Sequence, residues 1–206
     1  MQRSSARILR LMGMISGYGV AGLGLLYALV MAIGLIALPI SGAPIGQPWF
    51  GMMEVLILLL VPLLLGLAAA VRGTRVGPRY ARLALPFMAA ALALTSVVHL
   101  SILALGVRNA FAWPSLPYML DIIAWDGFFA LAVLLMAPAF RGAGDERTIR
   151  RLLIASSVLA LLGWLGPITG AMGLRMIGVL GYAIVFPLAA LLIARWFSRW
   201  RPAART

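Results

Sequence analysis

Two carboxylates lie within an apolar stretch that is long enough to cross a lipid bilayer. Residues 117–140 read PYMLDIIAWDGFFALAVLLMAPAF, and the carboxylates are Asp121 and Asp126. A helix needs roughly 20 apolar residues to cross a bilayer, and an ionised Asp near its middle costs on the order of 3 kcal/mol. We therefore expect these side chains to face other protein groups or water rather than lipid.

Other ionisable side chains fall at a similar level of neighbouring apolar stretches. Counted inward at about 1.5 Å per residue, Glu54 lies about 7 Å, Tyr182 about 9 Å, His99 about 10 Å and Asp126 about 13 Å from the same membrane face. Because imidazole pairs well with a carboxylate, the sequence predicts that His99 and the acids share one pocket. Asp121, at about 6 Å, is assigned to the mouth of that pocket.

Two further side chains extend this candidate site. Thr95 precedes His99 by one helical turn, which places its hydroxyl near the same face. Trp125, beside Asp126, offers either an aromatic wall for a cation or ordinary packing. Asp121 and Asp126 are five residues apart, about 140° around an α-helix, so we expect them on different faces.

Three functions fit such a site. In the first, a proton and a small cationic or amphipathic solute compete for an outward-facing acidic and histidine pocket, and proton-linked transport follows. In the second, Glu54, His99 and Asp126 form a hydrogen-bonded knot that holds the helices of a structural or accessory subunit together. In the third, an acid and His99 act as the acid/base pair of an enzyme on a lipid-soluble substrate. The first is our working prediction, and the other two stay open.

Composition excludes several other classes of protein. Of 206 residues, 64% are hydrophobic and 11% charged, as in an integral membrane protein. All 17 basic residues are arginine, cysteine is absent and His99 is the single histidine, which excludes a lysine Schiff base, a thiolate nucleophile and a multi-histidine metal site. The net charge of +12 comes mostly from arginines in short loops, so we expect no nucleic-acid partner. The chain carries no cofactor or metal motif, and we predict neither group.

Six apolar stretches predict an all-α membrane protein with a single six-helix transmembrane domain over residues 1–206. The stretches cover residues 13–40, 49–71, 83–106, 117–140, 152–172 and 176–197. By sequence position, 15 of the 17 arginines fall at the end shared by both termini, and Arg108 and Arg175 fall at the other end. This bias predicts a multi-pass protein of a bacterial inner (cytoplasmic) membrane with both termini in the cytoplasm. The first stretch is too long for the apolar part of a cleaved signal peptide.

Small residues recur at every fourth position of the first stretch, first at Gly13, Gly17 and Ala21 and then at Gly24, Ala28 and Ala32. Such rows let helices approach closely. We therefore expect this face either inside the bundle or against a second copy of the chain in a homo-oligomer. The lipid bilayer is the other expected partner.

Loop residues and prolines complete the prediction. Arg108, Asn109 and Trp113 fall between the third and fourth stretches, where a loop either gates the pocket or anchors at the lipid headgroups. Prolines within the second, fifth and sixth stretches each remove a backbone hydrogen bond and predict kinks, at Pro62, Pro167 and Pro187.

Overall fold

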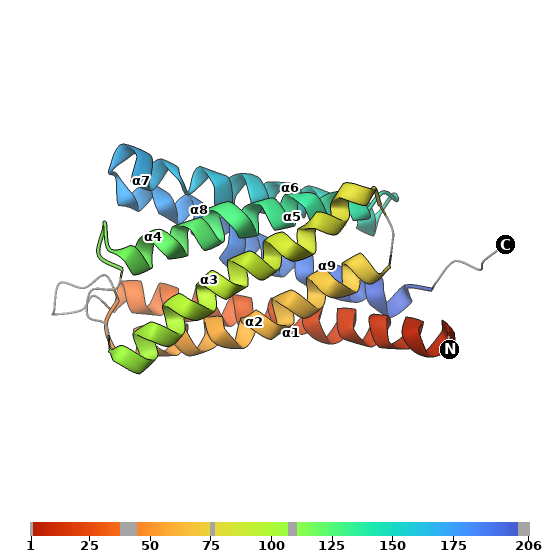
Figure 1. The fold of residues 1–206 in the computed structure, drawn as a ribbon, viewed down its shortest axis with the longest axis horizontal. Coiled ribbons are helices and arrows are strands. Elements are labelled where there is room, and N and C mark those ends of the chain that lie inside the picture. Colours follow the sequence, from red (N-terminus) through yellow and green to blue (C-terminus); the bar gives the residue numbers. More distant parts are fainter. Residues whose placement is uncertain (1, 38–44, 75–76, 107–110, 202–206) are drawn as a thin grey trace.

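The computed structural model of the chain describes residues 2–37, 45–74, 77–106 and 111–201, and every regular element among them is a helix. Within these residues, six helical segments are long and apolar enough to cross a membrane. They run side by side along the length of the molecule (Figure 1). Six such segments indicate a multi-pass membrane protein, in agreement with the sequence.

The six segments differ in how regular they are. The first two are the continuous helices α1 (Gln2–Ile36) and α2 (Trp49–Gly73), and the third joins a 3-10 turn, η1 (Arg79–Leu83), to α3 (Ala84–Leu105). The fourth consists of α4 (Leu116–Ile122), a π-helical segment η2 (Ile123–Phe129), α5 (Ala130–Met136) and η3 (Ala137–Ala139). The fifth contains α6 (Asp145–Leu162) and α7 (Leu165–Thr169). The sixth contains η4 (Met172–Arg175), α8 (Met176–Leu180), a second π-helical segment η5 (Gly181–Val185) and α9 (Phe186–Arg199).

Several helices start earlier than the apolar stretches predict. The first helix begins at Gln2 rather than at residue 13, and the fifth begins at Asp145 rather than at residue 152. Hydropathy marks the part of a helix that suits lipid, whereas the backbone stays helical through the polar residues beyond it. Asp145 and Glu146 occupy the first turn of α6, where carboxylates complement the helix dipole. The predicted end of the first helix, residues 38–40, lies outside the described residues.

The helices enclose one large apolar core and a second, small cluster around Val98 and Ile102. The helix α1 packs against α2 and α9, while α5 packs against α3 and α6 (Figure 1). Leu67, Met88, Phe129 and Ile193 are fully buried between these helices. Dispersion and close packing therefore hold the bundle together along most of its length.

Three glycines of the small-residue row on α1 pack inside the bundle against α9, whereas Ala32 at the end of that row is exposed. A Cβ atom added at Gly17 would lie 2.8 Å from the Cβ atom of Ala194, and one added at Gly24 would lie 2.6 Å from Cγ of Pro187. Gly13 is covered by the ring of Phe197. At these three glycines the neighbour of α1 is therefore α9 of the same chain.

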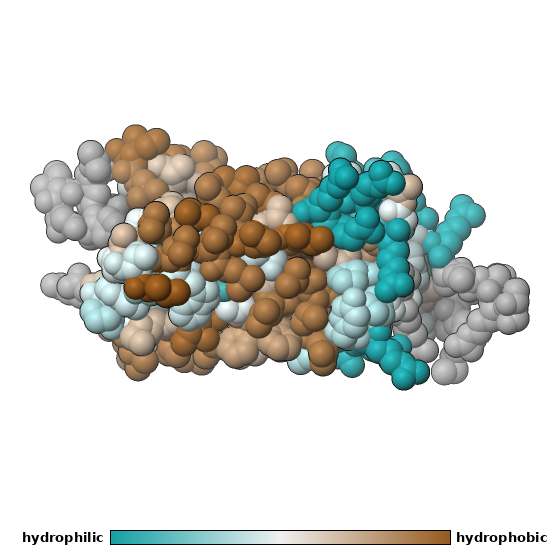
Figure 2. Space-filling view, turned by 90° about the horizontal axis from the view of Figure 1, so that it is seen from above, coloured by the Kyte–Doolittle hydropathy of each residue, from teal (hydrophilic) through white to brown (hydrophobic). Residues whose placement is uncertain are grey.

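The outer surface is apolar over most of its length and polar at one end (Figure 2). Large apolar side chains are about half exposed or more, among them Leu29, Val55, Leu59 and Leu100. Such a belt is costly in water and suits contact with acyl chains. The hydrophilic residues gather at the end of the bundle that carries both chain termini (Figures 1 and 2).

Candidate functional site: a buried charge cluster

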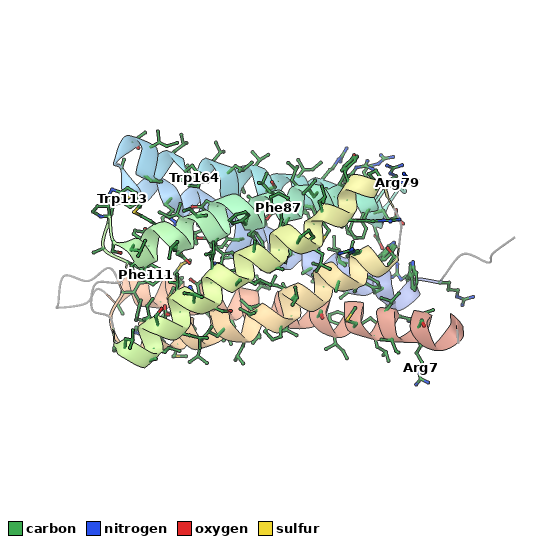
Figure 3. The ribbon with its side chains drawn as sticks, in the orientation of Figure 1. Arg7, Arg79, Phe87, Phe111, Trp113 and Trp164 are labelled. Carbon is green, nitrogen blue, oxygen red and sulfur yellow. The ribbon has the colours of Figure 1, made fainter. Side chains whose placement is uncertain are left out.

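Five charged or titratable side chains from four of the six segments meet inside the bundle. Glu54 comes from α2, His99 from α3, Asp121 from α4, Asp126 from η2 and Arg175 from η4. We call these five residues the charge cluster. The helix α4 and Phe111, whose ring lies 5.8 Å from that of His99, are at the end of the bundle opposite the two termini (Figures 1 and 3).

The charge cluster is a chain of four contacts with alternating charge. Nδ1 of His99 lies 2.7 Å from Oε2 of Glu54, and its Nε2 lies 3.3 Å from Oδ1 of Asp121. The guanidinium of Arg175 donates from Nη2 to Oδ2 of Asp121 at 2.6 Å and from Nε to Oδ2 of Asp126 at 3.2 Å. Each internal member of the chain therefore bridges two oppositely charged neighbours.

All five members of the charge cluster are buried, and none is more than 7% exposed. Water therefore does not solvate these charges from outside, and each depends on its neighbours for stabilisation. The carboxylates are surrounded by protein groups, one of the two surroundings that the sequence led us to expect. The burial also shows that Asp121 does not lie at an open mouth, where the sequence analysis assigned it.

The prediction that Asp121 and Asp126 lie on different faces was wrong, because the backbone between them is π-helical. In a π-helix each amide bonds to the carbonyl five residues earlier rather than four. Residues five apart are thus brought toward one face, and both carboxylates reach the guanidinium of Arg175. The 140° estimate assumed a regular α-helix.

Arg175 is the residue that the sequence analysis missed. It was counted as a loop residue, but it ends η4 and its side chain is buried in the bundle. Its guanidinium carbon lies 4.7 Å from the ring centroid of Tyr118 on α4, a cation–π contact. The available signal was the charge balance: three acids at a similar depth with a single histidine need a second cation. Arg175 directly precedes the sixth apolar stretch, residues 176–197, and could have been considered for that role.

His99 was expected to partner the acids, and it does so with a different pair. It contacts Glu54, as predicted, but its second partner is Asp121 rather than Asp126. Both ring nitrogens lie within hydrogen-bonding distance of carboxylate oxygens. Either His99 is an imidazolium that donates from both nitrogens, or one of the two carboxyl groups carries the proton.

Asp126 is enclosed by small residues of two other segments. A Cβ atom at Gly163 would lie 2.7 Å from Cγ of Asp126, and one at Gly178 would lie 2.7 Å from its Oδ1. The indole nitrogen of Trp164 donates to the backbone oxygen of Asp126 at 2.9 Å. Asp126 is fully buried, yet its Oδ1 has no hydrogen-bond partner among the described residues.

The other predicted site residues lie close to the charge cluster. Thr95 and His99 are both buried on α3, and neither Oγ1 of Thr95 nor the indole nitrogen of Trp125 has a partner among the described residues. The ring of Trp125 lies 5.0 Å from both the Phe129 and the Tyr182 rings. In this structure Trp125 packs against aromatic rings, and the aromatic residue over a cation is Tyr118.

The charges of the cluster do not balance. Three carboxyl groups face one arginine and one histidine, so with all three carboxyl groups ionised the cluster carries one net negative charge even when His99 is an imidazolium. A net charge in a buried site is costly. One further proton or one small cation would make the cluster neutral, and Oδ1 of Asp126 is the carboxylate oxygen without a partner.

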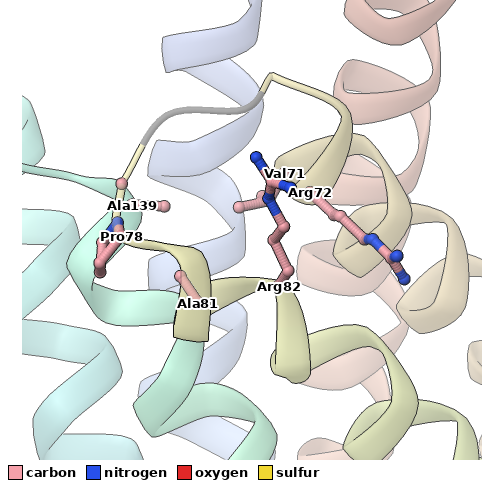
Figure 4. A pocket seen from close by; sticks show the side chains of 7 residues that line it. Val71, Arg72, Pro78, Ala81, Arg82 and Ala139 are labelled. Carbon is pink, nitrogen blue, oxygen red and sulfur yellow. The ribbon is translucent and has the colours of Figure 1, made fainter.

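Two hollows are lined by residues outside the charge cluster. The first has a volume of about 10 Å³ and lies between the end of α2 and the η1 turn, lined by residues such as Val71 and Arg82 (Figure 4). It is large enough for about one water molecule. The second is an open groove of about 480 Å³ that includes Tyr80 and Arg150.

The predicted gate is described in part. Trp113 is 38% exposed, and its ring lies 6.3 Å from the ring of Tyr118, at the same end of the bundle as Phe111 (Figure 3). Arg108 and Asn109 lie outside the described residues. Among the described residues, no group of three or more His, Asp or Glu side chains is arranged to hold a metal ion.

Comparisons of the chain with protein-family models, with curated proteins and with solved structures find no match.

Proposed function

We propose that the chain is a multi-pass protein of a bacterial cytoplasmic membrane, with both termini inside, in which the charge cluster links a proton to the binding or passage of a small cationic or amphipathic solute. The orientation is supported by the arginines. Fifteen fall at the end of the termini by sequence position, and because Arg175 is buried in the bundle, Arg108 is the one left at the opposite end.

The single observation that carries the functional proposal is the excess of one acid in a closed, buried site. A proton on Asp126 neutralises the cluster, and a cation that reaches Oδ1 of Asp126 neutralises it equally well. The two therefore compete for one position. Competition of this kind couples the movement of a proton to that of a solute. The site is neutral when it holds either one and carries a net charge when it is empty.

Two π-helical segments support a movement that opens the site. One, η2, carries Asp126, and the other, η5, carries Tyr182, whose ring contacts that of Trp125 on η2. Pro187, the second residue of α9, lies two residues after the end of η5 and cannot supply a backbone donor. A shift of either segment from π-helical to α-helical bonding rotates the side chains beyond it, and π-helical turns are frequent at functional sites.

The transport proposal is tested with purified protein in vesicles that contain a pH-sensitive dye. Tetraphenylphosphonium and ethidium serve as cationic probes, and an imposed proton gradient supplies the driving force. We expect proton flux that depends on the probe, is lost in Asp126→Asn and is kept in Asp145→Asn. Asp145 is a matched control, since it also pairs with an arginine, Arg199, but is exposed. Equal flux in Asp126→Asn would overturn the proposal.

A second candidate function is structural, and the continuous chain of contacts from Glu54 to Asp126 favours it. The four ion pairs link α2, α3, α4, η2 and η4, so the charge cluster also fixes how these elements pack. A purely structural role predicts that Asp126→Asn reduces the amount of folded protein. Normal folding with loss of probe-dependent flux favours the transport proposal instead.

A further inference from the structure

An open groove of about 480 Å³ lies on the surface, and none of the residues that line it belongs to the charge cluster. It is formed by η1, α5, η3, the residues after η3, and α6. Its lining comprises Tyr80, Leu134, Leu135, Ala137, Pro138, Arg141, Arg150 and Ile154. The groove therefore combines an apolar wall with two arginines and a tyrosine hydroxyl.

The two arginines are held in place but not neutralised. Nε of Arg141 donates to the carbonyl of Pro138 at 3.3 Å, and Nη1 of Arg150 donates to the carbonyl of Phe140 at 3.1 Å. A guanidinium has five N–H donors, so each arginine has further donors for a ligand. Among the described residues, neither arginine forms an ion pair with a carboxylate.

The acids nearest in sequence are engaged elsewhere. Asp145 pairs with Arg199 at 3.2 Å. Glu146 accepts hydrogen bonds from the backbone nitrogen of Gly142 at 2.6 Å and from the indole nitrogen of Trp196 at 2.9 Å. The positive charge at the rim of the groove is therefore available to an anion.

The apolar wall continues the lipid-facing surface. Leu134 is 38% exposed and Ile154 is 41% exposed, and both lie in segments long enough to span a membrane. The hydrophilic end of the molecule directly adjoins the apolar belt (Figure 2). The groove thus has the polarity profile of a phospholipid, with positive charge where the headgroup lies and apolar side chains where the acyl chain lies.

We propose that this groove binds an anionic phospholipid, with its phosphate on Arg141 and Arg150 and an acyl chain along Leu134 and Ile154. Basic pockets between spanning helices on the cytoplasmic side suit anionic headgroups. The site rests on the membrane placement proposed above and not on transport through the charge cluster. Phosphatidylglycerol is the probe that represents this chemistry.

The test is the thermal stability of the purified full-length chain in a neutral detergent, with added phosphatidylglycerol, phosphatidylcholine or glycerol phosphate. We expect a rise in Tm with phosphatidylglycerol alone. In Arg141→Gln/Arg150→Gln the apparent affinity for this lipid should fall about thirtyfold. The double variant Arg195→Gln/Arg201→Gln removes the same charge from exposed positions at the same end and should bind as the parent does.

The single variant Arg141→Gln is a second test in case the double variant does not fold. The Arg141 side chain is exposed, so this variant should fold and should bind phosphatidylglycerol more weakly than the parent. Equal lipid binding by the parent and both groove variants would overturn the proposal. A full rise in Tm with glycerol phosphate would also overturn it, because it would show a simple anion site. Loss of probe-dependent proton flux in Asp126→Asn has no bearing on this result, so the two proposals fail separately.

Discussion

Nη2 of Arg175 lies 2.6 Å from Oδ2 of Asp121, which joins the start of the last spanning segment to the start of the fourth. Both side chains are buried, and the guanidinium also reaches Asp126. Arg175 is therefore the counter-charge to two of the three acids. His99 contacts the third acid, Glu54, and shares Asp121 with Arg175.

Replacing Arg175 is expected to be severely destabilising. Arg175→Gln leaves Asp126 buried without a cation and leaves Asp121 paired with His99 alone among the described residues, and breaking a buried ion pair in this way costs about 3–5 kcal/mol. Thermal unfolding in detergent measures the loss. Arg199→Gln, which removes the arginine of an exposed pair, should change stability little.

Asp121 and Arg175 are expected to be energetically coupled. In a double-mutant cycle with Asp121→Asn and Arg175→Gln, the combined loss should be smaller than the sum by about 1–3 kcal/mol, because the second change removes a charge that the first left unpaired. Additive losses would show that the contact between these side chains contributes nothing to folding.

The two aspartates are expected to differ in their effect on folding. Asp121 bridges His99 and Arg175, so Asp121→Asn breaks two contacts and should cost about 3 kcal/mol or more. Asp126→Asn breaks one and also removes the excess negative charge, so Tm should change far less. If unfolding measurements ranked Asp126→Asn as the more harmful, the charge balance described above would be wrong.

The glycines around Asp126 are expected to be intolerant of a methyl group. Gly178→Ala would place Cβ 2.7 Å from Oδ1 of Asp126 and should destabilise the protein by about 1–3 kcal/mol. Gly173→Ala is the matched control, because its Cβ would meet nothing within 4 Å. Thermal unfolding of the two variants compares them, and equal Tm values would contradict the close packing around Asp126.

The membrane orientation can be tested with single cysteines, since the natural chain has none. Ala112 lies at the end of the bundle opposite the two termini, and Ala143 lies at the arginine-rich end. Both positions are exposed, and the variants are Ala112→Cys and Ala143→Cys. In intact cells, a membrane-impermeant maleimide should label Ala112→Cys but not Ala143→Cys. It should label Ala143→Cys only after the membrane is permeabilised. The reverse pattern would place the termini outside.

Much of the fold follows from hydropathy, because spans of about 20 apolar residues have few alternatives to a helix in lipid. The pairing of Glu54 with His99 was also predictable, since a buried carboxylate needs a partner and the chain has one histidine. The roles of Asp121 and Arg175 were not. A π-helical segment changes the angular position of every later side chain, and hydropathy alone gives no sign of it.

Arg175 shows a second limit of sequence reasoning. From sequence alone, an arginine beside a short loop is counted as a signal of membrane orientation, because the direction of its side chain is not known. Here Arg175 is the last residue of η4, and its side chain is buried. The excess of acids at that level was the available clue. That excess indicates that a second cation is needed but not which arginine supplies it.

The central claim, that a proton and a cation compete for the charge cluster, is tested most directly by proton release in a weakly buffered detergent solution. Addition of tetraphenylphosphonium to the purified protein should release up to one proton per chain, with the same result for Asp145→Asn and none for Asp126→Asn. Probe binding without proton release, or equal release from Asp126→Asn, would contradict the account.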